Sequence, residues 1–122
     1  MKKAYIKTGL YDIRIKFFDT NTAKVIYSKL PIVSTINFWG NEVYFFTNLK
    51  IKLEDNARNI VKKGELAFWS QGDAVAIGYG PTPISKGNEI RLASDCNIWG
   101  VTEFDLEKLN NLENNQEIVM TK

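Results

Sequence analysis

Apolar and polar residues alternate near the start of the chain in the way that a half-buried β-strand requires. Two such runs cover residues 4–8 and 11–18, and Gly9 lies in the turn between them. In the second run the charged residues alternate with Tyr11, Ile13, Ile15 and Phe17. This period of two predicts strands with one face on a core and the other in solvent.

The spacing of apolar residues then changes from two to a helical repeat. The positions i, i+3, i+4 and i+7 are occupied by Ala23, Ile26, Tyr27 and Leu30. Thr20, or alternatively Asp19, is expected to cap this helix, and Pro31 prevents it from continuing. We expect the apolar stripe to seal one end of a sheet, with docking of a partner as the alternative.

The remainder of the chain is again rich in β-forming residues. Strands are predicted within residues 31–39, 42–46, 48–53, 64–69, 74–80, 97–104 and 117–121. Turns are expected at residues 40–41 and 70–73, a polar connection at 54–59 and a loop at 84–89. Asp105 is expected to cap a short helix that carries Leu106 and Leu109.

About eight short strands and two helices in so small a chain predict a mainly β protein. So many strands leave exposed edges unless the sheet closes on itself. We therefore predict a single domain spanning residues 1–122, built as a closed, roughly eight-stranded β-barrel whose open ends are capped by the two helices.

Composition narrows the possible partners. The formal net charge is only +2, and the lysines are scattered among acids, so no nucleic-acid partner is expected. No apolar run approaches the roughly 20 residues of a membrane span, and residues 1–7 do not resemble a signal peptide. The lone Cys96 cannot form an internal disulfide, which favours a reducing, cytoplasmic compartment.

The absence of histidine restricts the chemistry further. The 122 residues include no histidine, which is the usual general base near neutral pH and the commonest transition-metal ligand. Serine–histidine and cysteine–histidine nucleophiles are excluded, and a zinc site would need carboxylates together with Cys96. We therefore expect no metal and no cofactor.

One predicted strand has a face made only of small residues: Ala74, Ala76, Gly78 and Gly80. Glycine weakens the interior of a strand, so another group is expected to approach this face closely. Two explanations remain open. Large side chains such as Phe38, Phe45 or Phe68 could fill the space within a narrow barrel, or the face could form a groove for a ligand or an extended peptide.

Aromatic residues are the first candidates for the wall of a binding site. Tryptophan and tyrosine combine a wide apolar face with one polar atom, which suits ligand recognition. The candidates are Trp39, Tyr44, Trp69 and Tyr79, with core packing as the alternative for each. Trp39 and Trp69 rank first because each lies beside a predicted turn.

Three polar residues complete the candidate ligand-binding set. Glu42 shares a strand face with Tyr44; it could orient a polar ligand or act as an acid or base, or it could accept hydrogen bonds from turn amides. Thr82 is held between Pro81 and Pro83, so its hydroxyl could be presented to a ligand or could simply end a strand. Asn97, near Ser94 and Asp95, is either a turn former or a polar contact.

Three blocks of sequence resemble a known family, the small bacterial and archaeal cyclophilin-like proteins. The blocks are NFWGNEVYF at residues 37–45, the stretch 64–83 ending in GPTP, and ASDCNIWG at residues 93–100. They occur in the family's order and spacing, and with the flanking helices the match spans nearly the whole chain. One departure is visible, because members often carry Trp-Pro-Pro-Gly where this chain has WSQG at residues 69–72.

The resemblance implies a closed barrel of about eight strands with two helices, but no established activity. Cyclophilins proper isomerise prolyl bonds with an arginine in a Phe-His-Arg context, which is missing here. None of Arg14, Arg58 and Arg91 can be matched to that arginine. The leading hypothesis is a non-catalytic module that binds a small molecule or a short extended peptide at an aromatic-lined barrel mouth. The alternatives are a prolyl isomerase, an accessory subunit of an amide-hydrolysing enzyme and a homo-oligomer building block.

Overall fold

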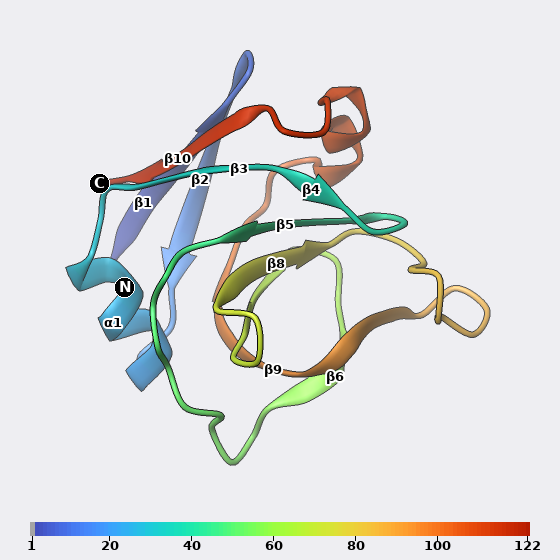
Figure 1. The fold of residues 1–122 in the computed structure, drawn as a ribbon, viewed down its shortest axis with the longest axis horizontal. Helices are drawn as coiled ribbons and strands as arrows, with labels where there is room; N and C mark the ends of the chain where they lie inside the picture. Colours follow the sequence, from blue (N-terminus) through green and yellow to red (C-terminus); the bar gives the residue numbers. More distant parts are fainter. Residues whose placement is uncertain (1) are drawn as a thin grey trace.

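A computed structural model describes residues 2–122 and shows a barrel of antiparallel strands (Figure 1). The strands are β1 (Lys3–Thr8), β2 (Tyr11–Phe17), β3 (Ile32–Thr35), β4 (Asn37–Phe38), β5 (Glu42–Phe46), β6 (Arg58–Val61), β7 (Glu65–Trp69), β8 (Ala74–Gly78), β9 (Ile90–Val101) and β10 (Glu117–Thr121). The helices are α1 (Asn21–Ser28) and the short 3₁₀ helix η1 (Leu106–Asn111). Neither helix is long and apolar enough to span a membrane.

The sheet closes because one segment of chain lies at both of its ends. The strand order is β3-β10-β1-β2-β9-β7-β8-β5-β4, and only Ile36 separates β3 from β4 in the sequence. Residues 32–35 pair with β10, and residues 37–38 pair with β5. Counting β3 and β4 as one strand, with β6 off this path, leaves eight strands around a nearly closed barrel. The predicted mainly β barrel with two helices is confirmed.

Helix α1 begins as the sequence predicts. The Thr20 hydroxyl accepts the Ala23 N–H at 3.1 Å, so Thr20 rather than Asp19 is the cap. Ala23 and Ile26 are buried in the barrel core, and Tyr27 packs edge-on against Phe17. Figure 1 shows the helix on the side of the barrel where both termini lie. The apolar stripe therefore packs against the sheet, as expected.

The second helix is shorter and capped differently from the prediction. Leu106 and Leu109 are buried, as their spacing indicated. The side chain of Asp105 precedes η1 but makes no capping hydrogen bond. The helix is a 3₁₀ turn held by the packing of its two leucines rather than by its cap.

Strands β7 and β8 bury both of their faces. Leu66 and Phe68 of β7, with Val75 and Ile77 of β8, belong to the main core inside the barrel. Because successive side chains of a strand point to opposite faces, Ala67 and Ala76 lie on the outer side of the same wall. That side is covered by an outer cluster whose buried members are Val61, Ala67, Ala76, Ile90, Leu92 and Cys96.

Strand β9 is longer than the sequence pattern indicated. It was predicted to begin at Asn97 but begins at Ile90, so Ser94 and Asp95 lie in a strand and not in a turn. Its first half pairs with β6, which begins at Arg58 inside the predicted polar connection. Its second half pairs with β7 and β2. In Figure 1 the first half of β9 and β6 lie side by side below β8, forming the layer over the outer cluster.

The predicted strand at residues 48–53 is wrong. The apolar alternation does not hold to its end, since Ile51 is buried but Leu53, on the same predicted face, is 54% exposed, and the segment forms no strand pairing. The side chain of Asn97 holds the end of the segment instead. Its amide NH₂ donates to the Lys52 carbonyl at 2.9 Å, and its Oδ1 accepts the Glu54 N–H at 2.8 Å. The same NH₂ group donates to the Thr22 hydroxyl at 2.9 Å, which ties the segment to α1.

Replacing Asn97 with Ala should therefore destabilise the fold. The change would leave the Glu54 N–H and the Lys52 carbonyl without partners, at a cost of about 2 kcal/mol in the free energy of unfolding. Urea denaturation checks this value, with Asn88→Ala, an exposed loop asparagine, as the control. Equal stability of the two variants would show that Asn97 does not hold the segment.

Candidate binding site

A cavity of about 280 Å³ lies on the outer side of the wall formed by β5, β8 and β7. Its lining residues are Trp39, Glu42, Tyr44, Trp69, Ala76, Leu92, Ala93 and Cys96. Four of the seven predicted ligand-binding residues are brought together here: Trp39, Glu42, Tyr44 and Trp69. The cavity belongs to the outer cluster, so these residues gather beside the barrel wall and not at an open end of the main core.

The small-residue face of β8 explains why this space exists. Next to Gly78 the face is filled, because a Cβ atom there would lie 2.5 Å from Cγ2 of Ile90. The face is also filled beside Gly80, because a Cβ atom there would lie 2.8 Å from Nδ2 of Asn41. Ala76, between Ala74 and Gly78 on this face, instead borders the cavity.

The small-residue face is therefore partly filled by other side chains and partly open as a groove, so both explanations hold in part. The side chains that fill it are not the predicted ones. Phe45 and Phe68 lie in the main core, and Phe38 packs against it, so none of them covers Ala76. The side chains that approach the small face come from Ile90 and Asn41. A groove remains only in the middle of the face.

Trp69 is fixed by its hairpin and by β9. Its indole N–H donates to the Ser94 hydroxyl at 2.9 Å. The turn that follows folds over the ring so closely that a Cβ atom at Gly72 would lie 2.3 Å from Cε3 of Trp69. Asp73 completes the turn with a φ of 53°. Glycine at position 72 is thus a packing requirement of the tryptophan.

Trp39 is positioned by a tight turn at residues 39–42, and this turn packs against the segment that contains Pro81. The Trp39 N–H donates to the Glu42 carbonyl at 2.9 Å, and Gly40 between them has a φ of +59°. The Asn41 N–H donates to the Pro81 carbonyl at 3.1 Å. The first two sequence blocks therefore meet at this point.

Glu42 is the one carboxylic acid in the cavity lining. It is 6% exposed, and its Oε1 has no hydrogen-bond partner among residues 2–122. The alternative role, accepting hydrogen bonds from turn amides, is not found in the described part of the chain. Burial raises the pKa of Glu42 to about 7 from an ordinary value of 4.5.

Cys96 shares the cavity with this carboxyl. Burial, and then the negative charges of Glu42 and Asp95, raise the pKa of the Cys96 thiol to about 12. The thiolate is the reactive form of cysteine, so Cys96 stays protonated and unreactive near neutral pH. Cys96 therefore contributes to the shape of the cavity and is not a nucleophile.

The other three predicted residues lie outside the cavity lining. Asn97 holds residues 52–54, as described above. Tyr79 packs in the main core and donates its hydroxyl to Oδ1 of Asn110 at 2.8 Å. Thr82 donates its hydroxyl to the Arg91 carbonyl at 2.5 Å. Each has protein partners that account for its polar group.

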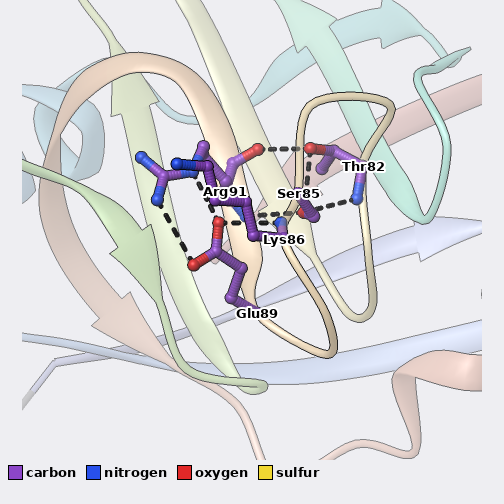
Figure 2. Close-up of polar contacts among 5 residues, drawn as sticks. All are labelled: Thr82, Ser85, Lys86, Glu89 and Arg91. Carbon is purple, nitrogen blue, oxygen red and sulfur yellow. Dashed lines mark hydrogen bonds and ion pairs between the residues drawn. The ribbon is translucent and has the colours of Figure 1, made fainter.

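Figure 2 shows that Thr82 belongs to a network that closes the loop before β9. The Ser85 hydroxyl accepts the N–H groups of Thr82 at 2.8 Å and Arg91 at 3.1 Å. The Glu89 carboxylate accepts the Lys86 N–H at 3.0 Å and Nε of Arg91 at 2.5 Å. Arg91, near the start of β9, is thereby tied to the loop that precedes the strand.

Arg58 is held in a similar way. It donates through two nitrogens to Glu65, at 2.9 and 2.5 Å, and this pairing holds the pKa of Glu65 below its usual range. Arg14 lies on β2, and none of the three arginines lines the cavity. Among residues 2–122 no cluster of three or more histidine, cysteine, aspartate or glutamate residues could hold a metal ion.

Three lining residues of β9 are not among those predicted from the sequence, namely Leu92, Ala93 and Cys96. Their neighbours Ser94 and Asp95 suggested a turn and hid the strand. The apolar alternation of Ile90 and Leu92 was the signal that could have revealed it.

Replacing Gly72 with Ala should displace the Trp69 ring. The added methyl group would overlap the ring, so the indole must move and lose its hydrogen bond to Ser94. A shift of the Trp69 indole N–H resonance in an NMR spectrum measures this. Gly87→Ala is the control, since Gly87 has a positive φ but no atom within 4 Å of the added group. An unmoved Trp69 resonance in the Gly72 variant would contradict the packing.

The raised pKa of Glu42 makes stability fall as the pH rises. The native state holds this proton until a pH of about 7, whereas the unfolded chain releases it near 4.5, so ionisation opposes folding between these values. The free energy of unfolding should drop by up to about 3 kcal/mol from pH 4.5 to pH 8 through this group.

Glu42→Gln should remove that drop and be the more stable protein at pH 8. Urea denaturation across this pH range gives the comparison. A control is Glu113→Gln, an exposed acid. Parallel pH profiles for wild type and Glu42→Gln would rule out the raised pKa.

Comparisons with known proteins agree with this architecture. The chain is 29% identical to the hypothetical protein AF2241 from Archaeoglobus fulgidus, whose solution structure it matches with a TM-score of 0.82, over 98% of this chain and 92% of the other. A structure of McbB in complex with tryptophan matches with a TM-score of 0.68 and 15% identity. That match covers 98% of this chain but 44% of McbB, so it shows a shared fold within a longer protein.

No curated protein matches the chain. The cyclophilin-like family model matches residues 2–121, nearly the full length of the sequence. With the barrel, its two helices and the three sequence blocks in place, the chain belongs to the cyclophilin-like family.

Proposed function

We propose that this protein is a non-catalytic binding module that holds a small molecule in the cavity between Trp39, Tyr44 and Trp69. The observation that carries the proposal is the carboxyl of Glu42, which is buried there with an oxygen that no described residue satisfies. A buried polar group without a partner costs stability. A ligand that supplies a donor would offset that cost.

The size and walls of the cavity favour a compact ring-containing ligand. Its volume of about 280 Å³ is just below the usual range for ligand pockets, which is roughly 300–1,000 Å³. An extended peptide would need a longer groove, and the face of β8 is filled on the side of Gly78. Three aromatic side chains suit a planar ring. The McbB structure adds support, because that longer protein, which shares this fold over 44% of its length, is in complex with tryptophan.

A prolyl isomerase is less well supported. That reaction in cyclophilins uses an arginine beside the apolar pocket, whereas Arg58 and Arg91 are paired with Glu65 and Glu89. No arginine is among the lining residues. No contact of the described residues favours self-association or an amide-hydrolysing partner over ligand binding.

A neutral indole compound, tryptophol, tests the proposal. Calorimetric titration should show saturable binding to the wild type, and Trp69→Ala should weaken it at least about tenfold, because one aromatic wall is lost. Tyr5→Ala is the matched control: Tyr5 is 38% exposed on β1 and lies outside the cavity lining. Unchanged affinity in the Trp69 variant would exclude this cavity as the site.

A further inference from the structure

We propose that the natural ligand of this cavity is an organic cation, a compact protonated amine whose ring lies between the aromatic walls and whose ammonium group donates to Glu42. The inference rests on the proposed function and specifies its ligand. It follows from the charge of the cavity lining, from its aromatic walls and from the unpartnered oxygen of Glu42.

The charges of the lining select for a positive ligand. Glu42 is the one lining residue that ionises near neutral pH, and neither lysine nor arginine lines the cavity. An anionic ligand would meet the carboxylate with no cation to balance it. A cationic ligand would neutralise the carboxylate of Glu42, which is itself buried.

The walls suit the same ligand. The faces of tryptophan and tyrosine rings carry negative charge density, which attracts a cation placed over them. Trp39, Tyr44 and Trp69 supply three such rings around one carboxylate. Ala76 and Leu92 complete an apolar surface that accommodates the hydrocarbon part of an amine.

The carboxyl of Glu42 is free to accept from a ligand. It is 6% exposed, and its Oε1 accepts no hydrogen bond from residues 2–122. An ammonium group has three N–H donors and forms charge-assisted hydrogen bonds with a carboxylate, which are about twice as strong as neutral ones. A neutral hydroxyl could fill the same space but would leave the charge of Glu42 uncompensated.

None of the ionisable groups around Glu42 competes with a ligand for pairing with its carboxylate. Tyr44 on β5 and Cys96 on β9 line the cavity, and the thiol stays protonated because its pKa is raised to about 12. Asp95 on β9 is exposed. Arg58 on β6 pairs in register with Cys96, but its guanidinium is bound to Glu65. The lining residues of β7 and β8, Trp69 and Ala76, do not ionise.

Binding of an amine should consequently depend on pH. The ammonium requires the ionised carboxylate, and burial holds the pKa of Glu42 at about 7 without ligand. Binding thus releases the Glu42 proton at lower pH. The amine itself stays protonated up to about pH 10, like a lysine side chain. Affinity should therefore rise about tenfold from pH 6 to pH 8, as the ionised fraction of Glu42 grows.

Three probes with one indole ring and side chains of similar length separate charge from shape. They are tryptamine, a cation; tryptophol, which is neutral; and indole-3-acetate, an anion. Calorimetric titration at pH 8 should give tryptamine at least about tenfold tighter binding than tryptophol, with indole-3-acetate the weakest. The tenfold difference corresponds to one charge-assisted contact.

Two charge-removing variants assign the effect. Glu42→Gln should abolish both the preference for tryptamine and its rise from pH 6 to pH 8, while tryptophol still binds, which also shows that the cavity is intact. Asp95→Asn, which removes an exposed charge from the neighbouring strand, should keep both.

The outcomes distinguish this inference from the proposed function. Binding of tryptophol without preference for tryptamine overturns the cation and leaves the binding module standing. A preference that persists in Glu42→Gln overturns the role of Glu42. Failure of all three probes to bind overturns the proposed function, and the cation with it.

Discussion

The two-sided burial of the β7–β8 hairpin is the constraint on which the rest of the structure depends. One face of this hairpin contributes Leu66, Phe68, Val75 and Ile77 to the barrel core. The other must accept a second layer, formed by β6 and the first half of β9. Only small side chains allow that layer to approach, so every second residue of β8 is alanine or glycine. Ile90 against Gly78 is the tightest instance.

The cavity is what this packing leaves unfilled. The outer layer meets the wall closely at Gly78, but beside Ala76 it stands away from it. Turns then place Trp39 and Trp69 at the border of that space, and β5 places Glu42 and Tyr44 in its lining. A carboxyl with an unpartnered oxygen among apolar groups is stable only because the barrel core supplies far more favourable burial elsewhere. The site thus lowers the stability of the fold locally, and the well-packed barrel core compensates for it.

The sequence predicts the barrel well where one face of a strand meets water. Strands β1, β2 and β10 show clear alternation, and α1 carries a complete helical stripe and cap. The predicted secondary structure was wrong where tertiary contacts determine the conformation of the backbone. The sequence of residues 48–53 alternates like that of a strand, but the segment pairs with no strand, and the side chain of Asn97 binds the backbone at its end, at Lys52 and Glu54. The first half of β9 contains turn-forming residues, yet pairing with β6 keeps it extended.

The predicted site residues also fall into two groups, those placed by strand position and those placed by tertiary contacts. The four residues beside or opposite the small face of β8 converge, because strand register alone brings Tyr44 opposite Ala76 and Glu42 opposite Gly78. Tyr79 and Thr82 lie close in sequence, but partners on η1 and β9 take their hydroxyls. Such partners come from residues 9 to 31 positions away, so no local pattern could reveal them.

The way the barrel closes has a consequence for how the chain folds. Strand β10 pairs with β1 on one side and with β3 on the other, so residues 117–121 complete two ladders that begin before residue 36. During synthesis the ribosome releases β10 after every other strand, and until then β1 and β3 each lack a neighbour. Ladders between such distant residues slow folding, because a long loop must be ordered before any pairing repays it. Without β10 the other strands can form only an open sheet with unpaired edges at β1 and β3, so the pairing of β10 is what closes the barrel.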